Sequence, residues 1–240
     1  MTNILSSLIG QKGPDVRNPF QAQKRLLGDG TDLTIFDVGA YVGDVTAIYR
    51  DIFPKATIYC FEPFPESFEK VSQLANSEFI RLYQIALCES DGRAKLQVNS
   101  DRSCNSLLPR PQSGAKYYSS KSQNVGQIEV ETRALDTFCD GEGISEIDIL
   151  KLDVEGAEIK VLTGASKKLA NQQIRLIFTE VMFVSHYESG CLFHEVSAFL
   201  RQYGYTLFNL YNLKRARNGQ LRWGNATFLS PEIRARIEAT

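Results

Sequence analysis

Short apolar runs alternate with helical patterns along most of the chain. The apolar runs predict buried strands over residues 33–38, 57–61, 79–86, 147–152, 175–181 and 205–211. Between them, apolar residues recur at helical spacing, which predicts helices over residues 45–53, 66–75, 157–169 and 194–203. Strands that alternate with helices are typical of a parallel sheet with crossover helices. The pattern therefore predicts an α/β fold.

The C-terminal part of the chain carries a different signal. Asn218-Gly219 is a strong turn signal for a β-hairpin, and it follows the strand predicted over residues 205–211. Residues 221–223 and 226–229 would form the returning strand. We therefore expect a mostly parallel sheet of about seven strands that ends in an antiparallel hairpin.

Two segments interrupt the alternation. Residues 99–126 are rich in Ser, Gln, Asn, Pro and Lys and are too long for an ordinary connection, so we expect a lid-like insertion there. The alternating pattern at residues 127–133 predicts a half-exposed strand. Residues 1–30 mix Gly, Pro, Gln and charge, which predicts an N-terminal arm with one short helix near residues 21–27. Residues 31–240 would then form a single domain.

Composition narrows the functional classes. The 240 residues are 43% hydrophobic and 23% charged, with a formal net charge of -1. This balance lacks the basic excess expected of a nucleic-acid or membrane-surface partner. No apolar run approaches the ~20 residues that span a bilayer. The five cysteines are scattered and form no CxxC pair, which fits free thiols in a reducing compartment. We expect a cytoplasmic protein, and the sequence leaves its oligomeric state open.

The first strand–helix junction carries a glycine motif. In the segment IFDVGAYVGD at residues 35–44, Gly39 permits a tight turn close to a ligand, and Gly43 lets the helix pack. The spacing is G-x-x-x-G, whereas a dinucleotide pyrophosphate needs G-x-G-x-x-G. Asp37 would repel a pyrophosphate but could hold an ammonium group. The alternative is a glycine turn that binds no ligand.

An acidic residue ends the second predicted strand. Glu62 follows Gly39 by 23 residues, close to the ~20 expected for an acid that binds ribose hydroxyls. Pro63 ends the strand and fixes the turn. Both motifs fall at the carboxyl edge of the sheet, where open α/β sheets bind ligands. The alternative for Glu62 is an exposed loop acid.

The segment DILKLDVEGAE at residues 148–158 concentrates charge after a buried strand. Strand alternation turns Lys151 and Asp153 to the same side. Charge at the end of a core strand is costly without a partner, which favours a functional role for both residues. Glu155 and Glu158 fall where a helix begins, and we expect Glu158 only to cap that helix.

Two further kinds of chemistry are open to these strand ends. His186 lies past the strand over residues 175–181, so His186 and Asp153 are our candidates for a general base. Asp153, Glu155 and Glu180 are candidate oxygen ligands for Mg²⁺ or Ca²⁺. Carboxylates at strand ends do not by themselves make a metal site, and we do not expect a metal cofactor. Arg222, beside the hairpin turn, is expected to belong to a charged, solvated hairpin.

Together these motifs resemble the FkbM-type methyltransferases. The resemblance runs from about residue 33 to 229, and Tyr41 stands where most members carry Asn. It rests on Asp37–Asp44 (DVGAYVGD), Phe61–Pro63 (FEP), Leu135–Phe138 (LDTF), Lys151–Glu158 (KLDVEGAE) and Thr179-Glu180.

The resemblance implies a Rossmann-like class I methyltransferase fold with S-adenosylmethionine as cofactor. It also implies O-methylation of a hydroxyl on a sugar or natural product, so the expected partner is a small-molecule or saccharide acceptor. It assigns the cofactor's methionine and ribose to the glycine loop and Glu62-Pro63, its adenine to the turn near Ala86, and its sulfonium to Asp153. The cofactor-binding residues so implied are Asp37, Gly39, Ala40, Tyr41, Gly43, Glu62, Pro63, Ala86, Leu87 and Asp153.

Two other functions share parts of this pattern. A NAD-dependent oxidoreductase uses the same order of strand, glycine turn, helix and acid. The missing phosphate-binding glycine and the presence of Asp37 argue against it. A non-catalytic Rossmann-like binding protein would keep the fold and the ligand site without turnover. A pocket where Asp37, Glu62 and Asp153 meet with room for an acceptor would favour the enzyme.

Overall fold

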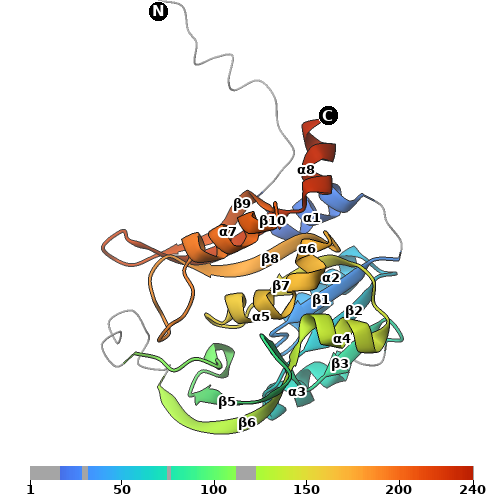
Figure 1. Ribbon diagram of the computed structural model, residues 1–240. Helices are drawn as coiled ribbons and strands as arrows, with labels where there is room; N and C mark the ends of the chain where they lie inside the picture. Colours follow the sequence, from blue (N-terminus) through green and yellow to red (C-terminus); the bar gives the residue numbers. More distant parts are fainter. Residues whose placement is uncertain (1–16, 29–31, 75–76, 112–122, 240) are drawn as a thin grey trace, which may run out of the picture.

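A seven-stranded sheet runs through the middle of the molecule (Figure 1). The computed structural model describes residues 17–28, 32–74, 77–111 and 123–239. The strands are β1 (Thr34–Val38), β2 (Thr57–Phe61), β3 (Ile80–Tyr83), β7 (Ile147–Leu152), β8 (Ile174–Met182), β9 (Thr206–Arg215) and β10 (Leu221–Leu229). Their order is β3-β2-β1-β7-β8-β10-β9, and β10 runs antiparallel to both of its neighbours. The predicted mostly parallel sheet with an antiparallel C-terminal hairpin is confirmed.

Helices cover both faces of this sheet, because the strands are apolar on both sides. One face carries α4 (Leu135–Glu142), α5 (Glu158–Gly164), α6 (Ser166–Ala170) and α7 (Phe193–Gln202). The other carries α1 (Pro19–Leu27), α2 (Asp44–Ile52), α3 (Pro65–Val71) and α8 (Pro231–Glu238). Successive strand side chains point to opposite faces, so Phe36 and Ile35 of β1 belong to different hydrophobic cores.

A second, three-stranded sheet lies beside the main one, at the bottom of Figure 1. It consists of β4 (Ala86–Cys88), β6 (Asn124–Ala134) and β5 (Gly92–Asn99), in that order. The prediction of a single strand over residues 79–86 is therefore wrong. The chain leaves the main sheet after β3, and the next strand, β4, pairs with β6 in the small sheet. An apolar run indicates a strand but does not specify its partner. Residues 112–122 of the predicted insertion lie outside the described residues.

Part of the predicted N-terminal arm is a packed helix. Leu26 and Leu27 of α1 are buried in the same core as α2, and the Tyr49 hydroxyl donates to Gln23 Oε1 at 3.0 Å. The short helix predicted near residues 21–27 is thus present as α1. Residues 1–16 lie outside the described residues, and the division into an arm and a domain stays a prediction. In the described ranges, no helix is both long and apolar enough to cross a membrane.

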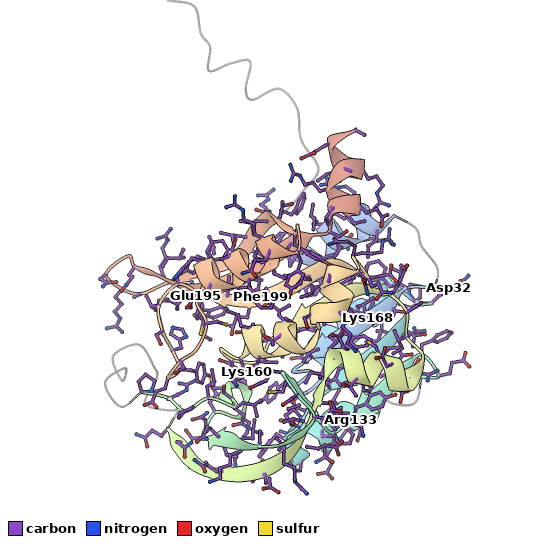
Figure 2. The ribbon with its side chains drawn as sticks, in the orientation of Figure 1. Asp32, Arg133, Lys160, Lys168, Glu195 and Phe199 are labelled. Carbon is purple, nitrogen blue, oxygen red and sulfur yellow. The ribbon has the colours of Figure 1, made fainter. Side chains whose placement is uncertain are left out.

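The helix predicted over residues 157–169 is two helices, α5 and α6, which meet at Ala165. Where α5 ends, its backbone lies close to the backbone of β4. A Cβ on Gly164 would lie 2.0 Å from the carbonyl oxygen of Cys88 in β4. On the same helix, Lys160 (labelled in Figure 2) pairs with Glu89, its Nζ 2.5 Å from Oε1. Helix α5 therefore joins the two sheets.

A buried ion pair joins β1 to β7 inside the main sheet. Asp37 and Lys151 are register partners, and Lys151 Nζ lies 2.9 Å from Asp37 Oδ1. The Thr46 hydroxyl of α2 donates to Asp37 Oδ2 at 2.6 Å. Burial opposes the charge of Lys151, but the neighbouring carboxylates, led by Asp37, outweigh it and raise the pKa of the ammonium. The ammonium of Lys151 thus stays charged inside the protein.

Removing one partner of this pair should be costly. We expect Lys151→Met to lower the free energy of unfolding by about 3–5 kcal/mol, because it leaves a buried carboxylate without its counter-charge. The control is Lys160→Met, which breaks an ion pair whose two side chains are 39% and 38% exposed; it should cost about 1 kcal/mol or less. Urea unfolding measures both, and equal losses would contradict the assignment.

A second pair of variants tests the contact between α5 and the small sheet. Gly164→Ala should destabilise the protein by about 1–3 kcal/mol, because the added methyl has no room against the β4 backbone. Gly141→Ala in α4 meets nothing within 4 Å and should stabilise it by up to about 1 kcal/mol. Thermal unfolding followed by circular dichroism compares the two. A neutral Gly164→Ala would mean that α5 can move away from β4.

Candidate active site

A cavity of about 470 Å³ opens at the carboxyl ends of β1, β2, β7 and β8. Its volume lies within the usual range for small-molecule sites, and its position is the ligand-binding edge of open α/β sheets. The main sheet forms one wall. Leu87 of β4 and residues 102–107 of the loop after β5 form the opposite wall. The small sheet thus supplies the cover of the cavity, where the sequence predicted only an insertion.

The turn after β1 brings two loops into contact. Gly39 has a φ of 73°, and a Cβ there would lie 1.9 Å from the carbonyl oxygen of Asp153. Only glycine allows the loop after β1 to lie this close to the loop after β7. Lys151 Nζ also donates to the Gly39 carbonyl at 2.8 Å. Tyr41 follows with a φ of 51°, in the left-handed region that Asn adopts more readily than Tyr.

Backbone groups hold the Glu62 carboxylate in place. Its Oε2 accepts a hydrogen bond from the Tyr41 amide, and its Oε1 accepts one from the Phe64 amide, each at 2.9 Å. The side chain is 8% exposed and lines the cavity. Burial raises the pKa of Glu62 to about 7, although both amide hydrogen bonds oppose this. Glu62 is therefore a fixed acceptor at the cavity wall that titrates near neutral pH.

Most of the predicted site residues meet in this one cavity. The predicted residues among its lining are Gly39, Tyr41, Glu62, Pro63, Ala86, Leu87, Asp153, Glu155, Glu180 and His186. They come from six separate segments of the chain. We call one part of this lining the β1–β2 side of the cavity. It consists of Gly39, Tyr41, Glu62, Pro63, Ile85, Ala86 and Leu87.

Three predicted residues do not line the cavity. Asp37 is fully buried and faces Lys151, so its carboxylate already has a cationic partner. Ala40 belongs to the core beneath the sheet edge. A Cβ on Gly43 would lie 2.5 Å from Leu74 Cδ1, so this glycine serves the packing of α2 near Leu74. The three residues support the loop, and their contact with a cofactor stays a prediction.

Three carboxylates gather where β7 and β8 end. Asp153, Glu155 and Glu180 each place an oxygen within 4.8 Å of the other two. The three side chains are half-buried, and desolvation by the surrounding protein comes first among the causes that raise the pKa of each carboxyl, that of Glu155 to about 8. Among the described residues, the buried Oε2 of Glu180 has no hydrogen-bond partner. The group could hold a hard cation or receive hydrogen bonds from a ligand's hydroxyl groups.

Cationic side chains lie across the same cavity. Arg110 donates to the Tyr187 hydroxyl at 2.9 Å, and that hydroxyl donates to Glu155 Oε2 at 2.6 Å. Arg222 lines the cavity as well. Burial, then Arg222 and Arg110, lower the pKa of His186 to about 4, so its imidazole is neutral at neutral pH. We call Glu180, His186, Arg222, Trp223 and Asn225 the β8–β10 side of the cavity; Arg110 faces it.

The expectation that Arg222 lies on a solvated hairpin is wrong, and a β-bulge explains why. From Leu221 to Trp223, β10 advances two residues while β9 advances one, from Arg215 to Lys214. Arg222 is the extra residue, and bulges re-aim side chains near functional sites. Both Arg222 and Trp223 consequently face the cavity. Sequence alternation alone could not place them, although a lone Trp beside an Arg was a usable signal.

The loop after β7 has its own internal support. Glu158 is buried, and its Oε1 accepts hydrogen bonds from the amides of Val154 and Gly156, each at 3.3 Å. Helix α5 begins at Glu158 and has no side-chain cap, so the prediction that Glu158 only caps the helix is wrong, and Glu158 instead stabilises the loop before α5. Ser106 Oγ of the covering loop donates to the Glu155 carbonyl at 2.8 Å, which ties the cover to the acidic wall.

Comparison with known proteins gives a consistent result. The family model described as Methyltransferase FkbM domain matches residues 37–207. The chain is 29% identical over 167 residues to 2-O-methyltransferase NoeI of Sinorhizobium fredii, covering 65% of this chain and 66% of that protein. It is 24% identical over 151 residues to hexuronic acid methyltransferase AglP of Haloferax volcanii, covering 62% and 56%. The matches thus span between half and two thirds of these relatives' length.

A solved structure shows the same fold. The match is a putative S-adenosylmethionine dependent methyltransferase from Listeria monocytogenes, with a TM-score of 0.50 and 7% identity, covering 88% of this chain and 97% of that one. The predicted class I methyltransferase fold is confirmed, and the predicted cofactor, S-adenosylmethionine, agrees with this family and fold. The chain belongs to the FkbM methyltransferase family.

Proposed function

We propose that this protein transfers the methyl group of S-adenosylmethionine to a hydroxyl oxygen of a sugar or natural product. One observation carries the proposal: a single cavity joins the β1–β2 side, with Glu62, to the polar β8–β10 side, with Asp153 between them. A cofactor and an acceptor could thus lie next to each other. The names of NoeI and AglP support a hydroxylated acceptor. The family match favours methyl transfer over the nicotinamide-dependent alternative.

The β1–β2 side suits the cofactor. The Glu62 carboxylate would accept hydrogen bonds from the two ribose hydroxyls, while Pro63, Ala86 and Leu87 offer apolar surface for adenine. When bound, S-adenosylmethionine supplies a methyl group on a sulfonium, which is already activated for transfer. The protein's main task is therefore to align the acceptor oxygen with that carbon and to receive the hydroxyl proton.

Asp153 is our choice for the proton acceptor. It follows β7, which lies between β1 and β8 in the sheet, and its side chain is 42% exposed, so an acceptor can reach it. His186 lines the far side of the same cavity, and its lowered pKa makes it a weaker base. Asp153 Oδ would take the hydroxyl proton as the acceptor oxygen bonds to the methyl carbon and the carbon–sulfur bond breaks, with S-adenosylhomocysteine as the leaving group.

Cofactor binding should depend on pH through Glu62. Its raised pKa of about 7 means that the ligand-binding carboxylate is mostly protonated at pH 6. We expect S-adenosylhomocysteine to bind roughly tenfold more weakly at pH 6 than at pH 8, by titration of one group with that pKa. Calorimetric titration at both pH values measures this ratio.

The control for this prediction is Glu62→Gln, which keeps the shape and removes the titration. It should bind weakly at both pH values, with no tenfold ratio. NAD, titrated alongside, should not bind. Binding of NAD without S-adenosylhomocysteine would overturn the proposed function, and a pH-dependent Glu62→Gln variant would overturn the role of Glu62.

The choice of base gives a second prediction. With an acceptor that turns over, Asp153→Asn should lower kcat by about 10²–10⁴-fold, the usual contribution of general base catalysis. S-adenosylhomocysteine affinity should stay within a factor of about three, because this product lacks the sulfonium charge that Asp153 would face. His186→Gln should lower kcat much less. The reverse order of the two effects would transfer the role to His186.

The same assay tests the metal alternative. Asp153, Glu155 and Glu180 together are the candidate ligands. We expect activity to persist in EDTA, because methyl transfer from a sulfonium requires no metal ion. A loss in EDTA that Mg²⁺ restores would instead make the three carboxylates a cation site.

A further inference from the structure

We propose that the acceptor carries an anionic group, and that Arg222 and Arg110 bind this group on the β8–β10 side of the cavity. The proposal rests on the proposed function and narrows it to acidic saccharides or other hydroxylated acids. It is carried by the way in which charge is distributed around the acceptor space.

Arg222 is held at the cavity with its charge uncompensated. As the extra residue of the β10 bulge it is half-buried, and among the described residues its buried Nε donates no hydrogen bond. Its guanidinium forms no ion pair in the same set of residues. A charged side chain that keeps a buried donor unsatisfied is costly, so a site that retains one is suited to a ligand of opposite charge. A guanidinium offers paired donors that match a carboxylate or a phosphate.

Arg110 adds a second cation to the same cavity. Its guanidinium carbon lies 5.0 Å from the centre of the Tyr187 ring, and it donates to the Tyr187 hydroxyl. These contacts fix its position while it also lines the cavity. Arg110 and Arg222 both act electrostatically on His186, which places their charges around the same space. Two guanidinium groups around one neutral imidazole form a basic region.

The acidic wall fits the rest of such an acceptor. Glu180 and Asp153 present carboxyl oxygens that accept hydrogen bonds from hydroxyl groups. A ligand with hydroxyls at one end and negative charge at the other would be oriented by both walls. The hydroxyl end then lies beside Asp153, where methyl transfer is proposed. Trp223 adds an aromatic surface between the two regions.

The test compares sugars of similar size with and without an anionic group. Protein saturated with S-adenosylhomocysteine is titrated with methyl β-D-glucuronide, glucose 1-phosphate and the neutral methyl β-D-glucoside, and binding is followed by ligand-observed NMR. We expect at least one anionic sugar to bind about tenfold or more tightly than the glucoside. The two anionic probes distinguish a carboxylate from a phosphate.

Two matched variants locate the effect. Arg222→Gln should abolish the preference for the anionic sugar, whereas Arg217→Gln removes an exposed charge from the same hairpin and should leave it unchanged. Both variants should keep wild-type affinity for S-adenosylhomocysteine, which excludes misfolding. Equal binding of all three sugars, no binding of either anionic sugar, or equal effects of the two variants would overturn the proposal. A wild-type protein that fails to bind S-adenosylhomocysteine would instead overturn the proposed function.

Discussion

The buried ion pair between Asp37 and Lys151 determines how the carboxyl edge of the sheet is built. Lys151 Nζ lies 2.9 Å from Asp37 and donates to the Gly39 carbonyl, so one ammonium holds both β1 and the turn that follows it. The Thr46 hydroxyl of α2 donates a hydrogen bond to the other carboxylate oxygen of Asp37. Taking two charges out of water is costly, and the cost is offset only when geometry and hydrogen bonds are complete. The pair therefore admits one arrangement of β1, β7 and α2, and the position of the glycine loop follows from it.

This arrangement also separates two kinds of charge. Lys151 Nζ lies 2.9 Å from a carboxylate oxygen of Asp37 but 3.9 Å from one of Asp153. The ammonium therefore attracts Asp153 more weakly than it attracts Asp37. Asp153 is consequently left with a raised pKa next to the cavity. Asp37 is the register partner of Lys151, and Asp153 follows Lys151 by two residues. The two aspartates thus differ in function: one supports the fold, and the other is available to a ligand.

Local sequence signals predicted the fold and ten of the residues that line the cavity. The ends of parallel strands meet at one edge, so the sequence alone groups Gly39, Glu62 and Asp153. The partner of Asp37 could not be predicted, because it depends on β1 and β7 being neighbours in the sheet. The place of Arg222 at the cavity could not be predicted for a similar reason. The direction of its side chain depends on a bulge that exists only in the pairing of β10 with β9. Residues whose role follows from strand position are predictable, whereas those that depend on pairing between distant segments are not.

The two sides of the cavity are built by different means, and this has a consequence for specificity. On the β1–β2 side, backbone amides of Tyr41 and Phe64 orient Glu62, so many side-chain changes would leave that geometry intact. On the β8–β10 side, recognition depends on side chains such as Arg222 and on the covering loop with Arg110. Backbone-built geometry persists when sequences diverge, while side-chain geometry changes with single substitutions. A fold of this kind can keep its cofactor and exchange its acceptor, and the charge of the β8–β10 side is then the property that decides which acceptor enters.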